Sequence, residues 1–103
     1  MQYVSTRDSQ KHCSAAQAIV QGLAQDGGLL TPVSLPRLPE TALKEMTAMS
    51  YQQRAVYVMQ LFLEDFSREE LTAFAAAAYG PAKFDTPEVT PVRTLDGNTH
   101  CLE

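Results

Sequence analysis

The chain has 103 residues, a formal net charge of −4 and a hydrophobic fraction of 45%. This length fits one small domain, or part of one, with a modest core but no room for a deep, enclosed cofactor site. The acidic balance argues against a nucleic-acid-binding protein, which carries a basic patch, and no apolar stretch approaches the roughly 20 residues that span a bilayer.

Residues 1–20 lack the apolar centre of a signal peptide, because charged side chains interrupt them. The two cysteines, Cys13 and Cys101, lie far apart and show no C-x-x-C spacing. We therefore expect a cytoplasmic protein with reduced thiols, which acts without a membrane or nucleic-acid partner.

The first third of the chain predicts one short strand and long connections. Residues 2–6 hold strand-forming side chains, whereas residues 7–13 are polar and predict a loop. Asp26-Gly27-Gly28 predicts a turn. Residues 29–39 contain three prolines, which fit neither a helix nor a central strand, so we expect an extended connector there.

Three capping boxes predict the starts of three helices. In each, a serine stands three residues before a glutamine or glutamate and directly precedes an apolar stripe of helical period. The pairs are Ser14 with Gln17, Ser50 with Gln53 and Ser67 with Glu70. A fourth helix is indicated by the spacing of Leu43 and Met46. We expect the four helices over residues 14–24, 40–49, 50–66 and 67–79.

The end of the sequence predicts a β-hairpin. Residues 84–91 form a connector punctuated by proline, and residues 92–102 read as two strands. Asp96-Gly97 suits a two-residue type I′ turn between them. Because a two-stranded hairpin alone is marginal in water, we expect the natural protein to continue beyond it.

These elements predict an α+β, predominantly α-helical fold, with about four helices, a short N-terminal strand and a C-terminal β-hairpin. We expect the apolar stripes of the helices to share one core. Its predicted members are Ile19, Val20, Leu23, Val58, Met59, Phe62, Leu71 and Phe74.

Few residue patterns in the sequence are typical of a catalytic, metal-binding or phosphate-binding site. His12-Cys13 and His100-Cys101 offer four metal ligands in principle. Neighbouring residues chelate one ion poorly, however, so we expect no zinc site. Asp26-Gly27-Gly28 follows a helix and lacks the remaining residues of a phosphate loop, which favours a plain helix-ending turn.

Two polar patterns remain. The acidic pairs Glu64-Asp65 and Glu69-Glu70 bracket a helix boundary, where a solvated capping role is favoured over acid–base chemistry. Ser5-Thr6-Arg7 leaves the N-terminal strand, and Arg7 offers a fork for a carboxylate or phosphate. A surface loop with a solvated arginine is the favoured alternative. We therefore assign no catalytic, cofactor-binding or metal-binding residue in this chain.

The sequence resembles the N-terminal part of threonine synthase over nearly its whole length. The most specific stretch is Gly-Leu-Ala-Gln-Asp-Gly-Gly-Leu at residues 22–29. The matching stretches, in order, are Tyr3–Arg7, Ser14–Ile19, Gly22–Pro32, Met49–Gln52, Leu61–Leu63 and Glu88–Val92. Because none of them is catalytic in itself, the resemblance concerns the domain rather than an active site.

The resemblance implies a pyridoxal-phosphate enzyme of fold type II, a lyase that converts O-phosphohomoserine and water to threonine and phosphate. The family's Schiff-base lysine lies in a His-Gly-Pro-Thr-x-x-x-Lys-Asp segment, which follows a Leu-Glu pair similar to Leu102-Glu103. Lys11, Lys44 and Lys83 match no part of that segment. We therefore expect pyridoxal phosphate and O-phosphohomoserine to bind in the full-length enzyme, and this fragment to be inactive and free of cofactor.

We accordingly expect residues 1–80 to be a helical accessory domain and residues 81–103 to lead into a catalytic domain, which is its partner. Surplus apolar area on the helix over residues 50–66 predicts weak self-association of the fragment. The alternative is a stand-alone helical interaction module with no enzymatic parent. A coding sequence that stops after Glu103 would favour that alternative.

Overall fold

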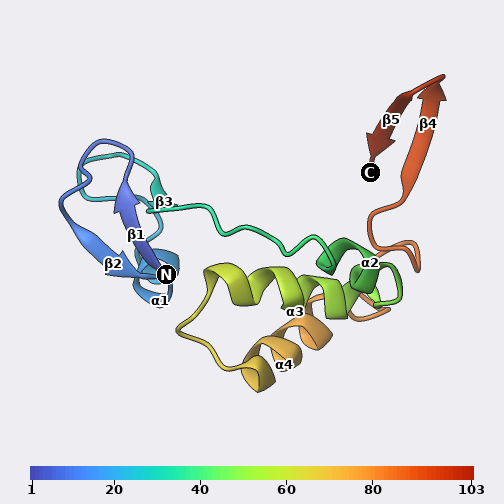
Figure 1. The fold of residues 1–103 in the computed structure, drawn as a ribbon, viewed down its shortest axis with the longest axis horizontal. Coiled ribbons are helices and arrows are strands. Elements are labelled where there is room, and N and C mark those ends of the chain that lie inside the picture. Colours follow the sequence, from blue (N-terminus) through green and yellow to red (C-terminus); the bar gives the residue numbers. More distant parts are fainter.

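The computed structural model describes residues 1–103 and arranges them in two lobes followed by a hairpin (Figure 1). The β lobe (residues 1–32) contains β1 (Gln2–Ser5), β2 (His12–Ser14), α1 (Ala15–Gln21) and β3 (Leu30–Pro32). The helical lobe (residues 42–79) contains α2 (Ala42–Thr47), α3 (Tyr51–Phe62) and α4 (Arg68–Ala78). The hairpin is formed by β4 (Val92–Asp96) and β5 (Thr99–Leu102).

The predicted α+β fold, with four helices, an N-terminal strand and a C-terminal hairpin, is confirmed. The arrangement is open, because an extended linker over residues 33–41 separates the lobes (Figure 1). The radius of gyration is 16.5 Å, against about 13 Å for a compact domain of this length.

The β lobe is built on a three-stranded antiparallel sheet in the order β2-β1-β3. Tyr3 pairs with Cys13 on one side and with Pro32 on the other. Of the three strands in this sheet, only β1 matches a predicted strand: the segment that forms β2 is mostly expected to be a loop, and β3 lies in the expected connector. Pro32 is tolerated because β3 is an edge strand, where a missing N–H breaks no inner ladder.

Capping boxes start α1, α3 and α4, as predicted. In each, the serine Oγ accepts a 3.2 Å hydrogen bond from the backbone N–H three residues on, and the glutamine or glutamate accepts the serine N–H. The helices are shorter than predicted at their C-terminal ends. For example, α1 ends at Gln21 because the backbone of Gly22 turns to a φ of 75°, which glycine adopts without steric cost.

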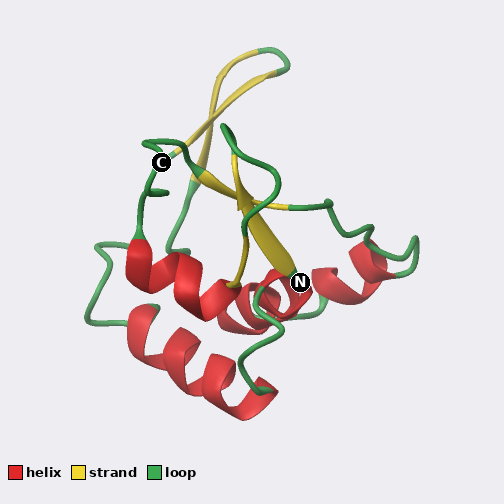
Figure 2. Cartoon of the chain, turned by 90° about the vertical axis from the view of Figure 1, so that its left-hand side faces the viewer, coloured by secondary structure: helices red, strands yellow, loops and turns green.

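The apolar core of the molecule lies between α3 and α4, which run side by side (Figure 2). Val56, Leu71 and Ala75 form its buried centre, and Leu71 is only 1% exposed. Four partly buried side chains pack against this centre, namely those of Met59, Leu63, Phe66 and Tyr79.

The prediction of one shared core is wrong. Ile19, Val20 and Leu23 are 61%, 89% and 63% exposed, because they belong to the β lobe, which does not pack its apolar side chains into the core between α3 and α4. Val58 and Phe74 are exposed as well. Of the eight predicted members, only Leu71 is fully buried and only Met59 packs against the buried centre.

The lobes meet at the C-terminal end of α3 and the loop that follows it. The Tyr3 hydroxyl donates a 3.1 Å hydrogen bond to the Phe62 carbonyl, and the Ala16 N–H donates one of 2.8 Å to Asp65 Oδ2. The N-terminal ammonium of Met1 also forms an ion pair with Glu64. This junction is therefore polar, in contrast to the apolar packing inside the helical lobe.

The hairpin projects away from the helices (Figure 1), and every residue of its two strands is exposed. Asp96 pairs with Thr99, so the turn lies at Gly97 and Asn98, one residue later than predicted. Of these two residues only Gly97 has a positive φ, of 48°. The predicted type I′ turn is therefore wrong, because that turn needs positive φ at both central residues.

Candidate functional site

Two polar motifs of the sequence meet at one end of the β-lobe sheet. The Ser5 hydroxyl donates a 2.8 Å hydrogen bond to Asp26 Oδ1, and the same oxygen accepts the Gly28 N–H at 2.8 Å. Arg7 Nη1 donates to the Asp26 carbonyl at 3.0 Å. We call residues 5–7 and 26–29, joined in this way, the Ser5–Asp26 clamp.

The clamp also uses the backbone groups on either side of it. The Thr6 N–H donates to the Leu29 carbonyl at 2.9 Å, and the Leu29 N–H donates to Thr6 Oγ1 at 3.1 Å. Ser5 is 8% exposed, and its Oγ accepts the Arg7 N–H at 3.1 Å in addition to its bond to Asp26. The side chains of Ser5 and Thr6 are therefore fully engaged in holding this corner of the fold.

Both glycines of the clamp are explained by its geometry. Gly27 has a φ of 78°, which side chains rarely adopt. Gly28 has no such backbone requirement, but a Cβ at this position would collide with the Ser5 Oγ. The predicted turn at Asp26-Gly27-Gly28 is confirmed. A Cβ at its last residue would come closest to the Ser5 Oγ and would also lie 3.0 Å from Asp26 Oδ1 and from Thr6 Oγ1.

The clamp keeps Asp26 ionised. The hydrogen bond from the Gly28 N–H, then that from the Ser5 hydroxyl, and also the positive charge of Arg7 hold the pKa of Asp26 below its usual value. A carboxylate with a lowered pKa is a fixed acceptor rather than a general acid or base near neutral pH. The hydrogen bonds of the clamp therefore stabilise the fold rather than serve catalysis.

Sequence reasoning treats Ser5-Thr6-Arg7 and Asp26-Gly27-Gly28 as unrelated motifs, and the structure brings them together. The missing signal is the pairing of β1 with β3, which aligns Ser5 with Leu30. Arg7 is exposed, as the favoured interpretation expects, but its guanidinium is tied to the Asp26 carbonyl.

The residues of this chain do not fit pyridoxal phosphate. The N–H of Gly27 donates to Ala24, that of Gly28 to Asp26 and that of Leu29 to Thr6, so the glycine turn has no free N–H for a phosphate. The lysines stand apart from this turn and from one another: Lys11 precedes β2, Lys44 lies on α2 and Lys83 follows α4, and all are exposed.

The other candidate groups are also separated or structural. His12-Cys13 lies on β2 and His100-Cys101 on β5, in different sheets, and no three His, Cys, Asp or Glu side chains gather as a metal site would require. Asp65 caps the start of α1 through the Ala16 N–H, which, together with the Ser14 hydroxyl, lowers the pKa of Asp65. Glu70 completes the capping box of α4.

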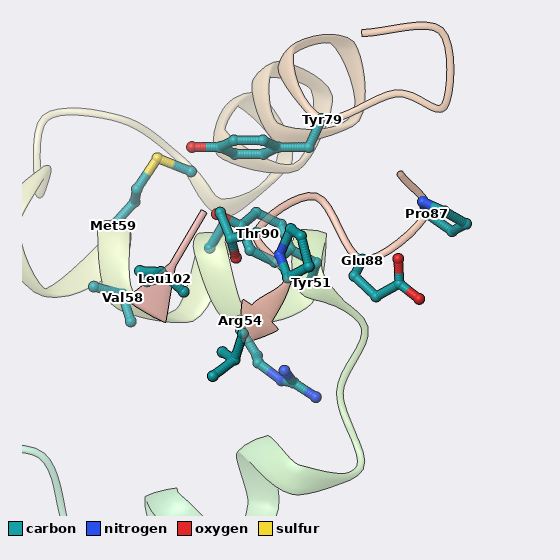
Figure 3. A pocket seen from close by; sticks show the side chains of 12 residues that line it. Tyr51, Arg54, Val58, Met59, Tyr79, Pro87, Glu88, Thr90 and Leu102 are labelled. Carbon is teal, nitrogen blue, oxygen red and sulfur yellow. The ribbon is translucent and has the colours of Figure 1, made fainter. Parts of the chain in front are cut away.

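An apolar cleft of about 820 Å³ lies between α3 and the base of the hairpin (Figure 3). One wall carries Tyr51, Val58 and Met59 of α3, and the other carries Val92 and Leu102 of the hairpin. Tyr79 stands above Tyr51, with the two rings edge to face at 5.0 Å between centroids. Sequence reasoning anticipates surplus apolar area on α3 but not this cleft.

The structure contains no helix that is long and apolar enough to cross a membrane. The class of protein follows from the relatives of the chain. The family described as "Threonine synthase N terminus" matches residues 2–79. The chain therefore belongs to the family of threonine synthase N-terminal regions, as the resemblance predicts.

Individual relatives agree with this assignment. The threonine synthase of Corynebacterium glutamicum is 33% identical over 97% of this chain, which spans 22% of that protein. The threonine synthase of Eremothecium gossypii is 38% identical over 98% of this chain, which spans 21% of that protein. The chain thus spans about a fifth of the length of the curated relatives it matches.

Solved structures show the same fold. The whole chain superposes on threonine synthase from Escherichia coli with a TM-score of 0.82 at 29% identity, and covers 23% of that chain. It superposes on the threonine synthase from Brucella melitensis, described as PLP-bound, with a TM-score of 0.86 at 30% identity, and covers 22% of that chain.

Proposed function

We propose that these residues are the N-terminal accessory region of a pyridoxal-phosphate-dependent threonine synthase, a lyase of threonine biosynthesis in the cytoplasm. The complete enzyme converts O-phospho-L-homoserine and water to L-threonine and inorganic phosphate. In this proposal residues 1–80 form the accessory domain, residues 81–103 lead into the catalytic domain, and the region itself is non-catalytic.

The family match over residues 2–79 carries the proposal. The share of about a fifth that the chain covers in its relatives supports a larger catalytic partner. The PLP-bound relative from Brucella melitensis supports the cofactor assignment for the complete enzyme. Pyridoxal phosphate acts there as an electron sink.

The chemistry of the described residues supports a non-catalytic role. The polar groups of the Ser5–Asp26 clamp are paired with one another, and the three lysines are exposed and lie on separate parts of the chain. The candidate side chains of this region therefore hold the fold, and the reacting groups are assigned to the rest of the enzyme.

Activity measurements separate the region from the complete enzyme. A longer protein that contains this region should release phosphate from O-phospho-L-homoserine and form threonine, and its rate should depend on added pyridoxal phosphate. The 103-residue chain should release none. Failure of the longer protein to form threonine would contradict the proposed reaction.

Borohydride reduction tests the cofactor assignment independently of turnover. In the 103-residue chain, exposed amines such as those of Lys11 and Lys83 should give only weak, unselective adducts with pyridoxal phosphate. Stoichiometric trapping on one lysine, located by peptide mass spectrometry, would contradict the placement of the cofactor site outside this region.

A further inference from the structure

The cleft between α3 and the hairpin base gathers apolar side chains that remain open to solvent. Val58 is 38% exposed on one wall, and Val92 and Leu102 are 63% and 69% exposed on the other. Scattered exposed apolar residues are normal on protein surfaces, but a concave group of them marks an interaction site. The cleft is therefore shaped to hold an apolar occupant.

The charged residues of the cleft do not favour a polar occupant. Arg54 donates a 2.8 Å hydrogen bond from Nε to the Met46 carbonyl, which ties its guanidinium to the end of α2. Glu88 lines the cleft on the side farther from Val58 and Met59 (Figure 3). Apolar contact is thus the main attraction that this surface offers.

The hairpin that forms one wall of the cleft lacks the packing that normally stabilises a hairpin. It consists of two strands with every residue exposed and no third strand beside them. Isolated two-stranded hairpins are marginally stable, and a third strand or a packed layer is normally needed. We therefore expect a further segment of protein to pack against the exposed hairpin.

The segment that connects α4 with the hairpin contains a strained residue beside the cleft. The Thr90 N–H donates a 2.7 Å hydrogen bond to the Glu88 carbonyl, which closes a three-residue turn around Val89. Val89 has a φ of 66°, the only positive φ at a non-glycine residue. This form of γ-turn is rare and costly for a β-branched residue, and such strain persists where surrounding contacts enforce it.

The relatives indicate which occupant fits. In them the matched region is about a fifth of the protein, so a much larger part of the same polypeptide is available to cover the cleft. Leu102, at the end of β5, lines the rim of the cleft. A segment that follows β5 in a longer chain therefore starts beside the cleft, and its docking there is intramolecular, with only the entropy of loop closure to overcome.

We propose that the cleft between α3 and the hairpin base is the docking surface for an apolar segment of the same polypeptide that follows residue 103. This inference rests on the proposed function, because it takes the occupant from the catalytic part of a threonine synthase. It adds the surface that carries the contact: Tyr51, Val58 and Met59 on one wall and Val92 and Leu102 on the other.

Thiol labelling of the longer protein tests this surface. Cys13→Ser and Cys101→Ser remove the two native thiols of residues 1–103, and cysteine then replaces Val58 or Val92. Peptide mass spectrometry reads the label at that position, so thiols elsewhere in the longer protein do not contribute. Ala73→Cys, at an exposed position of α4 outside the cleft, is the matched control. The labelling rate with a maleimide is measured for each native protein and for the same protein unfolded in guanidinium.

We expect the cysteines at positions 58 and 92 to label at least about tenfold more slowly in the native than in the unfolded protein, because burial blocks access to a thiol. The control at position 73 should label at nearly the unfolded rate. Native labelling of either cleft cysteine at the rate of the control would overturn the proposal.

The protection must also be independent of protein concentration. Protection that disappears on dilution would mean that a second copy fills the cleft, which contradicts an occupant from the same chain. Threonine formation is measured on the same variants before labelling. An active enzyme with an unprotected cleft refutes the docking surface alone, whereas an inactive unmutated enzyme refutes the proposed function.

Discussion

The two lobes are held together by different interactions. The helical lobe buries Leu71 and Val56 between α3 and α4, whereas the β lobe buries mainly alanines and Ser5 and depends on the hydrogen bonds of the clamp. Apolar burial is non-directional and tolerates exchange at constant volume. A hydrogen-bond network loses stability when one partner is displaced. Substitutions in the two lobes should therefore differ in their effect on the free energy of unfolding.

The largest loss is expected from the apolar core. Leu71→Ala should lower the free energy of unfolding by about 2–5 kcal/mol, because it removes a fully buried side chain and leaves a cavity. Leu43→Ala on α2, where the side chain is 65% exposed, is the control and should cost under about 1 kcal/mol. Urea unfolding followed by circular dichroism measures both, and equal losses would contradict the position of the core.

The next largest effect is expected in the clamp. Gly28→Ala should lower the free energy of unfolding by about 1–3 kcal/mol, as an added methyl does in a filled site. The backbone does not require glycine at this position, so the cost comes from crowding by neighbouring side-chain oxygens, of which the Ser5 Oγ is the closest. Urea unfolding of the purified variant gives the value.

A second substitution distinguishes this collision from a general intolerance of position 28. In the Ser5→Ala background, Gly28→Ala should cost clearly less than it does in the unmutated chain, since the obstructing oxygen is gone. Equal costs in the two backgrounds would show that the Ser5 hydroxyl does not set the identity of residue 28.

A smaller effect is expected at the strained turn beside the cleft. Val89→Gly should be more stable than Val89→Ala by about 1 kcal/mol, because only glycine adopts the positive φ without steric cost. At Thr90, whose φ is not positive, the order should reverse. An alanine variant at position 89 that is as stable as the glycine variant would argue against the strain.

The weakest effect is association of the 103-residue chain with itself. Apolar side chains on α1 and on the hairpin are exposed, including Val20 at 89% and Leu102 at 69%, and the hairpin presents unpaired strand edges. We expect weak, concentration-dependent self-association in sedimentation velocity experiments. Strictly monomeric behaviour over a wide concentration range would contradict this expectation.

The sequence predicts features whose causes are local. The capping boxes at Ser14, Ser50 and Ser67 place three helix starts correctly, because each box lies within four residues of the chain. The hairpin is found for the same reason. Its exact turn is not, because the bulge between Thr94 and Asp96 shifts the register by one residue.

Features that depend on pairing between distant segments are not predictable in this way. Recognition of the clamp requires the pairing of β1 with β3, which are about 25 residues apart and short enough to lack a clear alternation. The single predicted core fails because the apolar stripes of α1 and α3 do not reveal that the linker holds the two helices in different lobes.

Hydrogen exchange across a pH series tests most directly whether the two lobes depend on different interactions. The pKa values of Asp26 and Asp65 are lowered in the folded chain, mainly by hydrogen bonds from the Gly28 and Ala16 N–H groups. Their contribution to stability is therefore fully present above the pKa of the unfolded state, which is about 4. It is lost as the pH falls through the lower pKa of the folded state.

Exchange rates corrected for intrinsic chemistry should show the β-lobe amides of Thr6, Gly28 and Leu29 losing protection as the pH falls from 7 to below 4. The amides of α3 and α4 should retain theirs over that range. In Asp26→Asn, which keeps an acceptor but no titrating group, the loss at Gly28 should be greatly reduced. Simultaneous loss in both lobes, or an unchanged pH dependence in Asp26→Asn, would contradict the account.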